Sequence, residues 1–253
     1  MATTSSTDSE DRRTQLLAML QATGVIRLTD AADQLSVSTM TVRRDLDGLA
    51  EEGLLRRVRG GAVSVIGPRP FDQRRAVRLR AKETIADKAL ALVPRVGSIA
   101  FDGSTTVGTL AYRLGTRSDL TVTTNSYYIF ATLTGLSGVR PVLTGGEPEQ
   151  ITESLVGPIA VQAAEALRYQ RFFVSGTAID SQFGTTEVSL RESAVKRAFG
   201  RMSKELVLCI DSSKLQQQST AACLAIGEAS LLITELPPSD PRLDEFRELI
   251  EVW

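Results

Sequence analysis

The stretch 36–62, SVSTMTVRRDLDGLAEEGLLRRVRGGA, constrains this chain more than any other part of its sequence. Its apolar residues recur at the spacing of an amphipathic helix, which would bury them against a core. These apolar residues are Val42, Leu46, Leu49 and Ala50. Ser38 is placed to cap the start of the helix, and Gly53 marks its end. The opposite face then carries the side chains Thr39, Met40, Thr41, Arg43 and Arg44.

A basic strand and a double-glycine turn follow this helix. Residues 54–58 alternate apolar and basic side chains, as a short strand does. Gly60-Gly61 permits a tight turn and close approach to a phosphate backbone. The basic side chains of this wing are Arg56, Arg57 and Arg59. Two helices are expected before the recognition helix, over 11–23 and about 29–35, with 36–38 as the connecting turn.

Together these segments predict a winged helix-turn-helix over residues 11–62. The side chains expected to contact DNA lie at the exposed helix start and in the wing. They are Ser38, Thr39, Met40, Thr41, Arg43, Arg44, Arg56, Arg57 and Arg59. The alternative is a small helical bundle whose arginines serve only solubility. Because cap, turn, apolar stripe and basic wing all agree, the pattern favours DNA binding.

The distribution of charge separates this head from the rest of the chain. At 253 residues the chain exceeds what a small DNA-binding domain needs, so a second domain is expected. The net charge is −1, yet residues 11–80 hold 13 basic against 8 acidic side chains, whereas 81–253 hold 16 against 20. A basic head on an acidic body is typical of a DNA-reading module joined to something that does not touch DNA.

Several classes of protein are excluded or disfavoured by what the sequence lacks. There is no histidine, which excludes histidine-based triads, histidine-ligated zinc and imidazole acid–base chemistry. Cys209 and Cys223 lie in apolar company, which favours buried thiols over a disulfide or a metal pair. No apolar run approaches a membrane span, and residues 1–10 lack the features of a secretion signal and are expected to form a disordered tail. We therefore expect a cytoplasmic protein with no membrane partner, no metal, no cofactor and no catalytic residues.

The remainder of the chain predicts an α/β domain. Residues 63–73 contain glycine and prolines and are expected to form a linker, and a helix is expected over 70–93. Apolar runs then alternate with helical patterns, which predicts a mostly parallel sheet over 74–235. The expected strands are 98–101, 120–124, 139–143, 171–174, 205–210 and 231–234. The C-terminal tail, 236–253, suggests a short amphipathic helix of no evident function.

Small polar residues and glycines follow one predicted strand after another. The loop Asp102-Gly103-Ser104-Thr105-Thr106 combines small side chains, hydroxyls and a helix start, which suits a phosphate. Asn125-Ser126 and Gly145-Gly146 follow the next two strands, and all these loops would meet at the carboxyl edge of the sheet. Lys196 and Lys214 are the candidate cations, although spacing alone also allows Lys196 to be a solvated helix position.

Both halves of the chain resemble the DeoR family of bacterial sugar-metabolism regulators. Residues 12–62 resemble its winged helix-turn-helix in the words LSVSTMTVRRDLDGLAEEGLL and RVRGGAV. Residues from 74 to about 235 resemble its sensor domain, related in fold to ribose-phosphate isomerases and CoA transferases, in FDGSTT, TVTTNS, LTGGE, SLVGPIA, ESAVKRAF and IDSSKL. The resemblance implies an effector site formed by Asp102, Gly103, Ser104, Thr105, Thr106, Asn125, Ser126, Gly145, Gly146, Glu192, Lys196 and Lys214.

The sequence departs from the family's pattern in four places. Ser36 stands where the family often has glycine, and Arg59 stands where histidine is common. SGTAID, residues 175–180, has fewer glycines than usual, with Thr177 where aspartate is common. Gln216 to Gln218 replace the glycine that usually follows DSSKL. The last two departures bear on which sugar is recognised.

These observations predict a transcriptional regulator, expected to be a repressor of carbohydrate-metabolism genes, that leaves operator DNA when a phosphorylated sugar binds. A homo-oligomer is expected, because one recognition helix buries too little surface for operator-grade affinity. The alternative is a sugar-phosphate isomerase-like enzyme with an accessory DNA-binding domain, in which Asp180, Glu187 and Lys196 would act. A third possibility is an architectural nucleic-acid binder with an inert body, which the loops at the strand ends disfavour.

Overall fold

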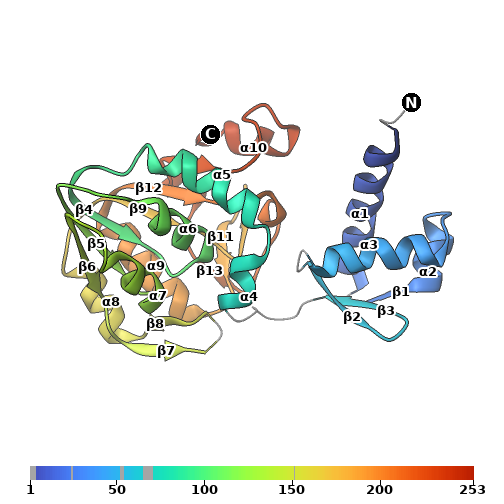
Figure 1. The fold of residues 1–253 in the computed structure, drawn as a ribbon, viewed down its shortest axis with the longest axis horizontal. Coiled ribbons are helices and arrows are strands. Elements are labelled where there is room, and N and C mark those ends of the chain that lie inside the picture. Colours follow the sequence, from blue (N-terminus) through green and yellow to red (C-terminus); the bar gives the residue numbers. More distant parts are fainter. Residues whose placement is uncertain (1–3, 24, 52–53, 65–70, 151) are drawn as a thin grey trace. The chain divides into compact units, whose positions relative to one another are not determined.

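The computed structural model describes residues 4–23, 25–51, 54–64, 71–150 and 152–253. The chain divides into two compact units, Met1–Pro68 and Arg69–Trp253, and each is considered by itself (Figure 1). Gly53, the predicted end of the recognition helix, lies outside the described residues. Within the described residues, no helix combines the length and apolarity needed to cross a membrane.

The first unit consists of three helices and a three-stranded sheet. The elements are α1 (Thr4–Thr23), β1 (Val25–Arg27), α2 (Leu28–Gln34), α3 (Thr39–Glu51), β2 (Leu55–Val58) and β3 (Gly61–Ser64). The strands pair antiparallel in the order β1-β3-β2. Val42, Leu46 and Leu49 of α3 are buried together with Leu16 and Leu20 of α1, as the helical spacing predicts. The winged helix-turn-helix is confirmed, and β1 is a strand that the sequence analysis did not predict.

The expectation of a disordered tail over residues 1–10 does not hold from Thr4 onward, because α1 begins there; residues 1–3 lie outside the described residues. The turn before α3 shows why the family often has glycine where this chain has Ser36. Ser36 has a φ of 53°, in the left-handed region that glycine adopts without cost. The backbone here takes the conformation that a glycine would favour, although serine occupies the position.

The second unit is built on a seven-stranded sheet in which every pairing is parallel. Its order is β15-β14-β12-β9-β4-β5-β6, and the six predicted strands account for all of it except β15. These strands are β4 (Val96–Phe101), β5 (Asp119–Thr124), β6 (Val139–Leu143), β9 (Tyr169–Val174), β12 (Ser203–Cys209) and β14 (Leu231–Ile233). Their apolar runs are continuous because helices cover both faces of the sheet.

Two hydrophobic cores lie on the two faces of this sheet. One contains Ile85, Val107 and Ile129, from α5 (Leu79–Leu90), α6 (Thr105–Arg113) and α7 (Tyr127–Leu133). The other contains Ala160 and Val195, from α8 (Pro158–Glu165) and α9 (Leu190–Arg201). Cys209 and Cys223 are buried free thiols in these cores, as predicted. The mostly parallel α/β architecture expected from the sequence is confirmed (Figure 1).

The helix expected over 70–93 is broken into two. Helix α4 spans Phe71–Ala76, and α5 begins at Leu79. Arg78, between them, has a φ of 51°. Its guanidinium pairs with Asp211 at 3.1 Å and with Glu235 at 2.5 Å. Helical periodicity continues across the break, so only these long-range ion pairs show why the chain turns there.

The C-terminal segment belongs to the second unit and is not a separate tail. Strand β15 (Glu251–Val252) pairs in parallel with β14 and forms one edge of the main sheet. Phe246 of α10 (Asp244–Arg247) is fully buried in the core that contains α8 and α9. Residues 236–253, which the sequence analysis set apart as a tail, therefore contribute a strand to the main sheet and a buried side chain to its core.

Short elements that the sequence analysis did not predict surround the carboxyl edge of the sheet. Strands β7 (Glu147–Glu149) and β8 (Ser154–Val156) form a hairpin. Strands β10 (Ala178–Asp180), β11 (Gly184–Glu187) and β13 (Ala221–Ala222) form a small antiparallel sheet. The turn η1 (Ser212–Lys214) follows β12, while η2 (Ile226–Glu228) and η3 (Pro241–Leu243) complete the fold.

The two glycines of the wing have different roles. Gly60 has a φ of 82°, and a Cβ built on it would meet no atom within 4 Å. Gly61 pairs with Arg27 across the sheet, and a Cβ there would lie 1.9 Å from the carbonyl oxygen of Ile26. Gly60 therefore supplies the turn conformation, whereas Gly61 supplies the space that lets β3 approach β1.

We predict that Gly61→Ala lowers the free energy of unfolding of the first unit by roughly 3 kcal/mol or more, because backbone must move to admit the methyl group. Gly60→Asn is the matched control, since asparagine tolerates the left-handed region and the position is open. Thermal unfolding followed by circular dichroism measures both. Equal melting temperatures for Gly61→Ala and the parent protein would contradict this account.

Candidate functional site

The start of helix α3 displays the side chains that were predicted to contact DNA. The Ser38 hydroxyl accepts a hydrogen bond from Thr41 N at 3.0 Å, so the predicted cap is confirmed. Met40 is 67% exposed. Ser38, Thr39, Arg43 and Arg44 are also exposed, and Thr41 is half-buried. A helix end with exposed polar and basic side chains has the form needed to enter a major groove.

A partly buried ion pair, which sequence reasoning missed, holds the recognition helix against α1. Asp45 is only 3% exposed, and its carboxylate accepts hydrogen bonds from the Nε and Nη2 of Arg12 on α1. The spacing places Asp45 near the buried stripe, but only the tertiary contact identifies its partner. This ion pair orients α3 on α1, because removing either side chain would leave the other charge without this partner.

The three arginines of the wing divide into two groups. Arg56 and Arg59 are exposed. Arg57 instead donates from its Nε to Asp47 Oδ1 at 2.7 Å and from Nη1 to the carbonyl oxygen of Gly61. Arg57 thus joins the wing to α3, and Arg56 and Arg59 are the better candidates for phosphate contacts. The DNA contacts themselves remain a prediction.

In the second unit, a buried ion pair organises the carboxyl edge of the main sheet. Lys196 of α9 is 4% exposed, and its Nζ lies 2.9 Å from Asp102 Oδ2 and 2.6 Å from Glu187 Oε1. It also donates to the carbonyl oxygen of Ser175 at 2.8 Å. Burial alone would lower the pKa of Lys196, but Asp102, Glu187 and Glu192 raise it well above its ordinary value. Lys196 is therefore a charged, buried lysine and not a solvated helix position.

The Asp102 loop is held mainly by hydrogen bonds inside the protein. Asp102 Oδ1 accepts from Ser104 N and Oγ, and Oδ2 accepts from Ser175 N at 3.0 Å. Ser104 caps α6 through Val107 N, and Ser126 caps α7 through Ile129 N. Asp102, Ser104 and Ser126 thus shape the site from within, and Thr105 and Thr106 are buried behind them.

Next to this loop lies a small set of polar atoms that resembles a binding cradle. Asn125 Oδ1 and Thr106 Oγ1 are buried, and within the described part of the chain neither has a hydrogen-bond partner. A Cβ on Gly103 would lie 3.5 Å from Asn125 Oδ1 and 3.8 Å from Glu192 Oε1. It would also lie 2.9 Å from Ser154 Cβ, so the absence of a side chain at Gly103 lets the Asp102 loop pack closely against Ser154 beside these polar groups.

Glu192 forms the floor of this cradle with Ser154 from the β7–β8 hairpin. Ser154 Oγ donates to Glu192 Oε2 and is itself in hydrogen-bond contact with Thr152 Oγ1. Burial raises the pKa of the Glu192 carboxyl, while Lys196 opposes that rise. Ser154 was not predicted as a site residue, because its hairpin is too short to leave a strand signal.

A cluster of cations lies at the same edge of the sheet. We call Arg74, Arg78, Lys82 and Lys214 the cationic cluster, after the mutual repulsions that link them. The Lys214 ammonium donates to Gly176 O at 2.7 Å and Ser175 Oγ at 3.1 Å, and it lies 3.9 Å from Asp211 Oδ2. Burial lowers the pKa of Lys214, although Asp211 opposes that shift. Three of the four cations come from 70–93, where the sequence analysis assigned no function.

Lys82 is the most perturbed member of the cationic cluster. It is 4% exposed and donates to the carbonyl oxygen of Arg74. Burial, followed by repulsion from Lys214, lowers its pKa from 10.5 to about 7. Burial likewise lowers the pKa of Arg74. A buried lysine that lies among other cations and resists protonation is in an environment that an anion would stabilise.

Not every predicted effector residue joins these clusters. Gly145 and Gly146 have φ values of 68° and 112° after the edge strand β6. A Cβ on Gly146 would lie 2.6 Å from the carbonyl oxygen of Val156, so this glycine permits the turn into the β7–β8 hairpin. Their contacts are with that hairpin and α8, and they explain the local turn without a ligand.

The fold defines a two-domain protein in which a winged helix-turn-helix precedes a parallel α/β domain. A model described as the DeoR C-terminal sensor domain matches residues 77–236, and one described as a DeoR-like helix-turn-helix domain matches residues 12–66. The chain belongs to the DeoR family of transcriptional regulators.

The relatives of this chain include proteins named as repressors. It is 30% identical to a lactose phosphotransferase system repressor of Lactococcus lactis subsp. lactis, over 94% of this chain and 95% of that protein. It is 28% identical to the glycerol-3-phosphate regulon repressor of Escherichia coli (strain K12), over 90% and 91%. Among solved structures, ribose 5-phosphate isomerase A of Neisseria gonorrhoeae matches with a TM-score of 0.37 and 14% identity, covering 53% of this chain and 52% of that one.

We predict that the stability of the second unit rises with pH above about 7, because unfolded Lys82 keeps a proton that the native state has lost. The slope expected from this one group is about 1.4 kcal/mol per pH unit, ending near pH 10 where unfolded lysine titrates. Urea unfolding between pH 6 and 10 measures it, and Lys82→Met should flatten the curve. Lys204→Met, at an exposed position on β12, is the control. Parallel curves for parent and Lys82→Met would contradict the shifted pKa.

Proposed function

We propose that this chain is a repressor of carbohydrate-metabolism genes that binds operator DNA through α3 and the wing and is released by a phosphorylated sugar. The observation that carries the proposal is the cationic cluster at the carboxyl edge of the sheet, where Lys82 has a pKa of about 7. A phosphate dianion would reduce the repulsion between the buried Lys82 and the half-buried cations around it. The names of the relatives, one of which is a glycerol-3-phosphate regulon repressor, support this class of effector.

The contacts of helix α4 supply a physical route from the effector site to the interdomain segment. Phe71, its first residue, is 2% exposed, and its N donates to Glu153 Oε1 at 3.2 Å. Arg74 Nη2 donates to Thr152 O at 2.8 Å, and Lys82 holds the carbonyl oxygen of Arg74. An anion that draws Arg74 or Lys82 therefore acts on the first helix after the linker. Such coupling amounts typically to about 1–3 kcal/mol.

The alternative of a sugar-phosphate isomerase receives little support from the same residues. Asp180 Oδ1 accepts from the N atoms of Gln182 and Phe183, so this carboxylate caps the β10–β11 turn. Glu187 is engaged by Lys196 and by Thr177 Oγ1 at 2.8 Å. A general base needs a carboxylate available to the substrate, and Lys196 already neutralises Glu187. We infer that the chain is a regulator and not an enzyme, acting as a homo-oligomer on repeated half-sites.

We predict that the double variant Arg43→Ala, Arg44→Ala loses about 2 kcal/mol or more of operator affinity, because exposed arginines at the helix start reach base edges and phosphates. A gel shift on DNA selected by the parent protein measures this loss. Arg80→Ala removes an exposed arginine from the other unit and serves as the control. Parental affinity in the double variant would show that α3 is not the reading element.

We predict that Lys214→Met leaves operator affinity intact and abolishes release by sugar phosphates, because the variant keeps the DNA-binding unit and removes a cation from the effector site. The test is a gel shift across a panel of sugar phosphates, parent beside variant. Lys204→Met is the matched control, because Lys204 lies at the amino end of β12, the strand that precedes η1 and Lys214. Release of both proteins by the same metabolite would place the site elsewhere. Conversion of that metabolite to an isomer by the parent would establish the enzyme instead.

A further inference from the structure

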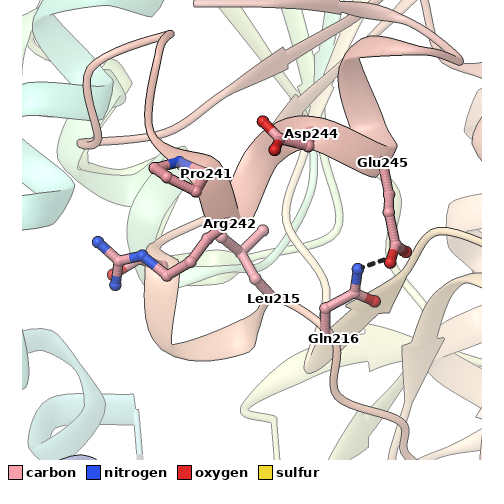
Figure 2. Close-up of a pocket in the computed structure, with 7 residues that line it drawn as sticks. Leu215, Gln216, Pro241, Arg242, Asp244 and Glu245 are labelled. Atoms are coloured by element: carbon pink, nitrogen blue, oxygen red, sulfur yellow. Dashed lines mark hydrogen bonds between the residues drawn. The ribbon is translucent and has the colours of Figure 1, made fainter. Parts of the chain in front are cut away.

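An open pocket lies beside η1 on the second unit and is lined by two segments far apart in sequence. Its volume is about 470 Å³, within the range of small-molecule sites. One wall comes from the DSSKLQ stretch after β12, and the other comes from the C-terminal segment at η3 and α10 (Figure 2). The lining residues are Ser212, Leu215, Gln216, Pro241, Arg242, Asp244 and Glu245.

The pocket wall contains a strained residue at the position where the sequence departs from the family's pattern. Gln216 has a φ of 52°, in the left-handed region that disfavours a side chain. Its Nε2 donates to Glu245 Oε2 at 2.8 Å, the dashed contact in Figure 2, and Ser181 Oγ donates to the same oxygen at 2.5 Å. Backbone strain of this kind persists where the surrounding structure holds it, and it is concentrated at functional sites. Here the strain places an amide against a carboxylate across the pocket.

The chemistry of the lining favours hydroxyl groups over a second phosphate. Asp244 and Glu245 are acidic; Asp244 Oδ1 pairs with Arg247, outside the lining, and the lining cation Arg242 is bound to both carboxylate oxygens of Asp240 at 2.9 Å. Because the lining carries two carboxylates and only one cation, which is already paired, it disfavours a phosphate dianion. Carboxylates and an amide carbonyl accept hydrogen bonds from hydroxyls, while Leu215 and Pro241 offer apolar surface to the C–H face of a sugar.

The pocket adjoins the cationic cluster through η1. Ser212 lines the pocket, and Lys214, two residues later, belongs to the cluster. The short turn η1 therefore carries residues of both the pocket wall and the cationic cluster. Ser212 Oγ also accepts from Arg78 Nη2 at 2.7 Å, so one short turn touches both environments.

We propose that this pocket is the subsite that selects the sugar, receiving the hydroxylated end of an effector whose phosphate lies in the cationic cluster. This assignment rests on the proposed function and adds to it the residues that distinguish one sugar from another. The sugar hydroxyls donate hydrogen bonds to the carboxylates of Asp244 and Glu245. The amide of Gln216 can donate to a hydroxyl or accept from one. A site built to bond a hydroxyl rejects analogues that lack it or present it wrongly, because its own polar groups are then left unpaired.

The test uses the full chain and isothermal titration with inorganic phosphate, sorbitol 6-phosphate, galactitol 6-phosphate and free sorbitol. In the variant Asp244→Asn, Glu245→Gln, the affinity for the better-bound sugar phosphate falls about tenfold or more, while the affinity for inorganic phosphate stays at the parental value. Gln216→Gly, which suits the left-handed backbone, is a second variant with the same expected direction. Glu248→Gln is the control, an exposed carboxylate in the same segment outside the pocket.

Three outcomes overturn the assignment, and they are distinguishable. Unchanged sugar-phosphate affinity in both variants, with parental binding intact, removes the pocket from the effector site and leaves the proposed function standing. Equal affinity of the parent for free sorbitol and for its phosphate ester shows a pocket for free sugars, unconnected with the cationic cluster. Failure of the parent to bind any sugar phosphate refutes the proposed function itself, and this assignment with it.

Discussion

The second unit depends on one buried charge cluster, in which Lys196 lies between Asp102 and Glu187. These three side chains come from α9, the end of β4 and β11, and the same ammonium holds the carbonyl oxygen of Ser175 after β9. Burying three charges is tolerated only because each is paired, and removal of one partner from such a cluster costs about 3–5 kcal/mol. The elements around the carboxyl edge of the sheet are therefore locked in one arrangement before any ligand arrives.

At the other half of this edge, which holds the cationic cluster, the charges are less completely paired. Asp211 interacts with Arg78, Lys82 and Lys214, whereas Glu235 pairs with Arg78; burial, followed by repulsion from Lys214, lowers the pKa of Lys82 in spite of Asp211. A rigid, neutralised half beside an under-neutralised half is a suitable arrangement for a sensor. In the proposed function, an anion at the cationic cluster would act on α4 through Arg74, whose Nη2 donates to Thr152 O and whose carbonyl oxygen accepts from Lys82.

Two departures from the family's sequence pattern have the same physical character. Ser36 and Gln216 both replace a usual glycine, and both retain a left-handed φ, of 53° and 52°. Each such residue costs about 1 kcal/mol or more relative to a relaxed conformation, so neighbouring contacts must hold it in place. The Gln216 amide has that contact in Glu245, whereas Ser36 lies in the short turn between α2 and α3. The substitution is visible in the sequence, but its conformation is not.

The sequence by itself determined the parts of this protein that depend on neighbours along the chain. The stripe and cap of α3, the six strands of the parallel sheet and the polar residues at their ends follow from local periodicity and turn chemistry. Only the tertiary structure decided which charges meet. Arg12 reaches Asp45, Arg78 reaches Asp211, and Lys82 approaches Lys214, across separations that no local pattern encodes. The two residues of β15 are too few to show a periodicity, and their place at the sheet edge comes from pairing with β14. Burial and long-range pairing, which set each charge's energy, exist only once the chain has folded.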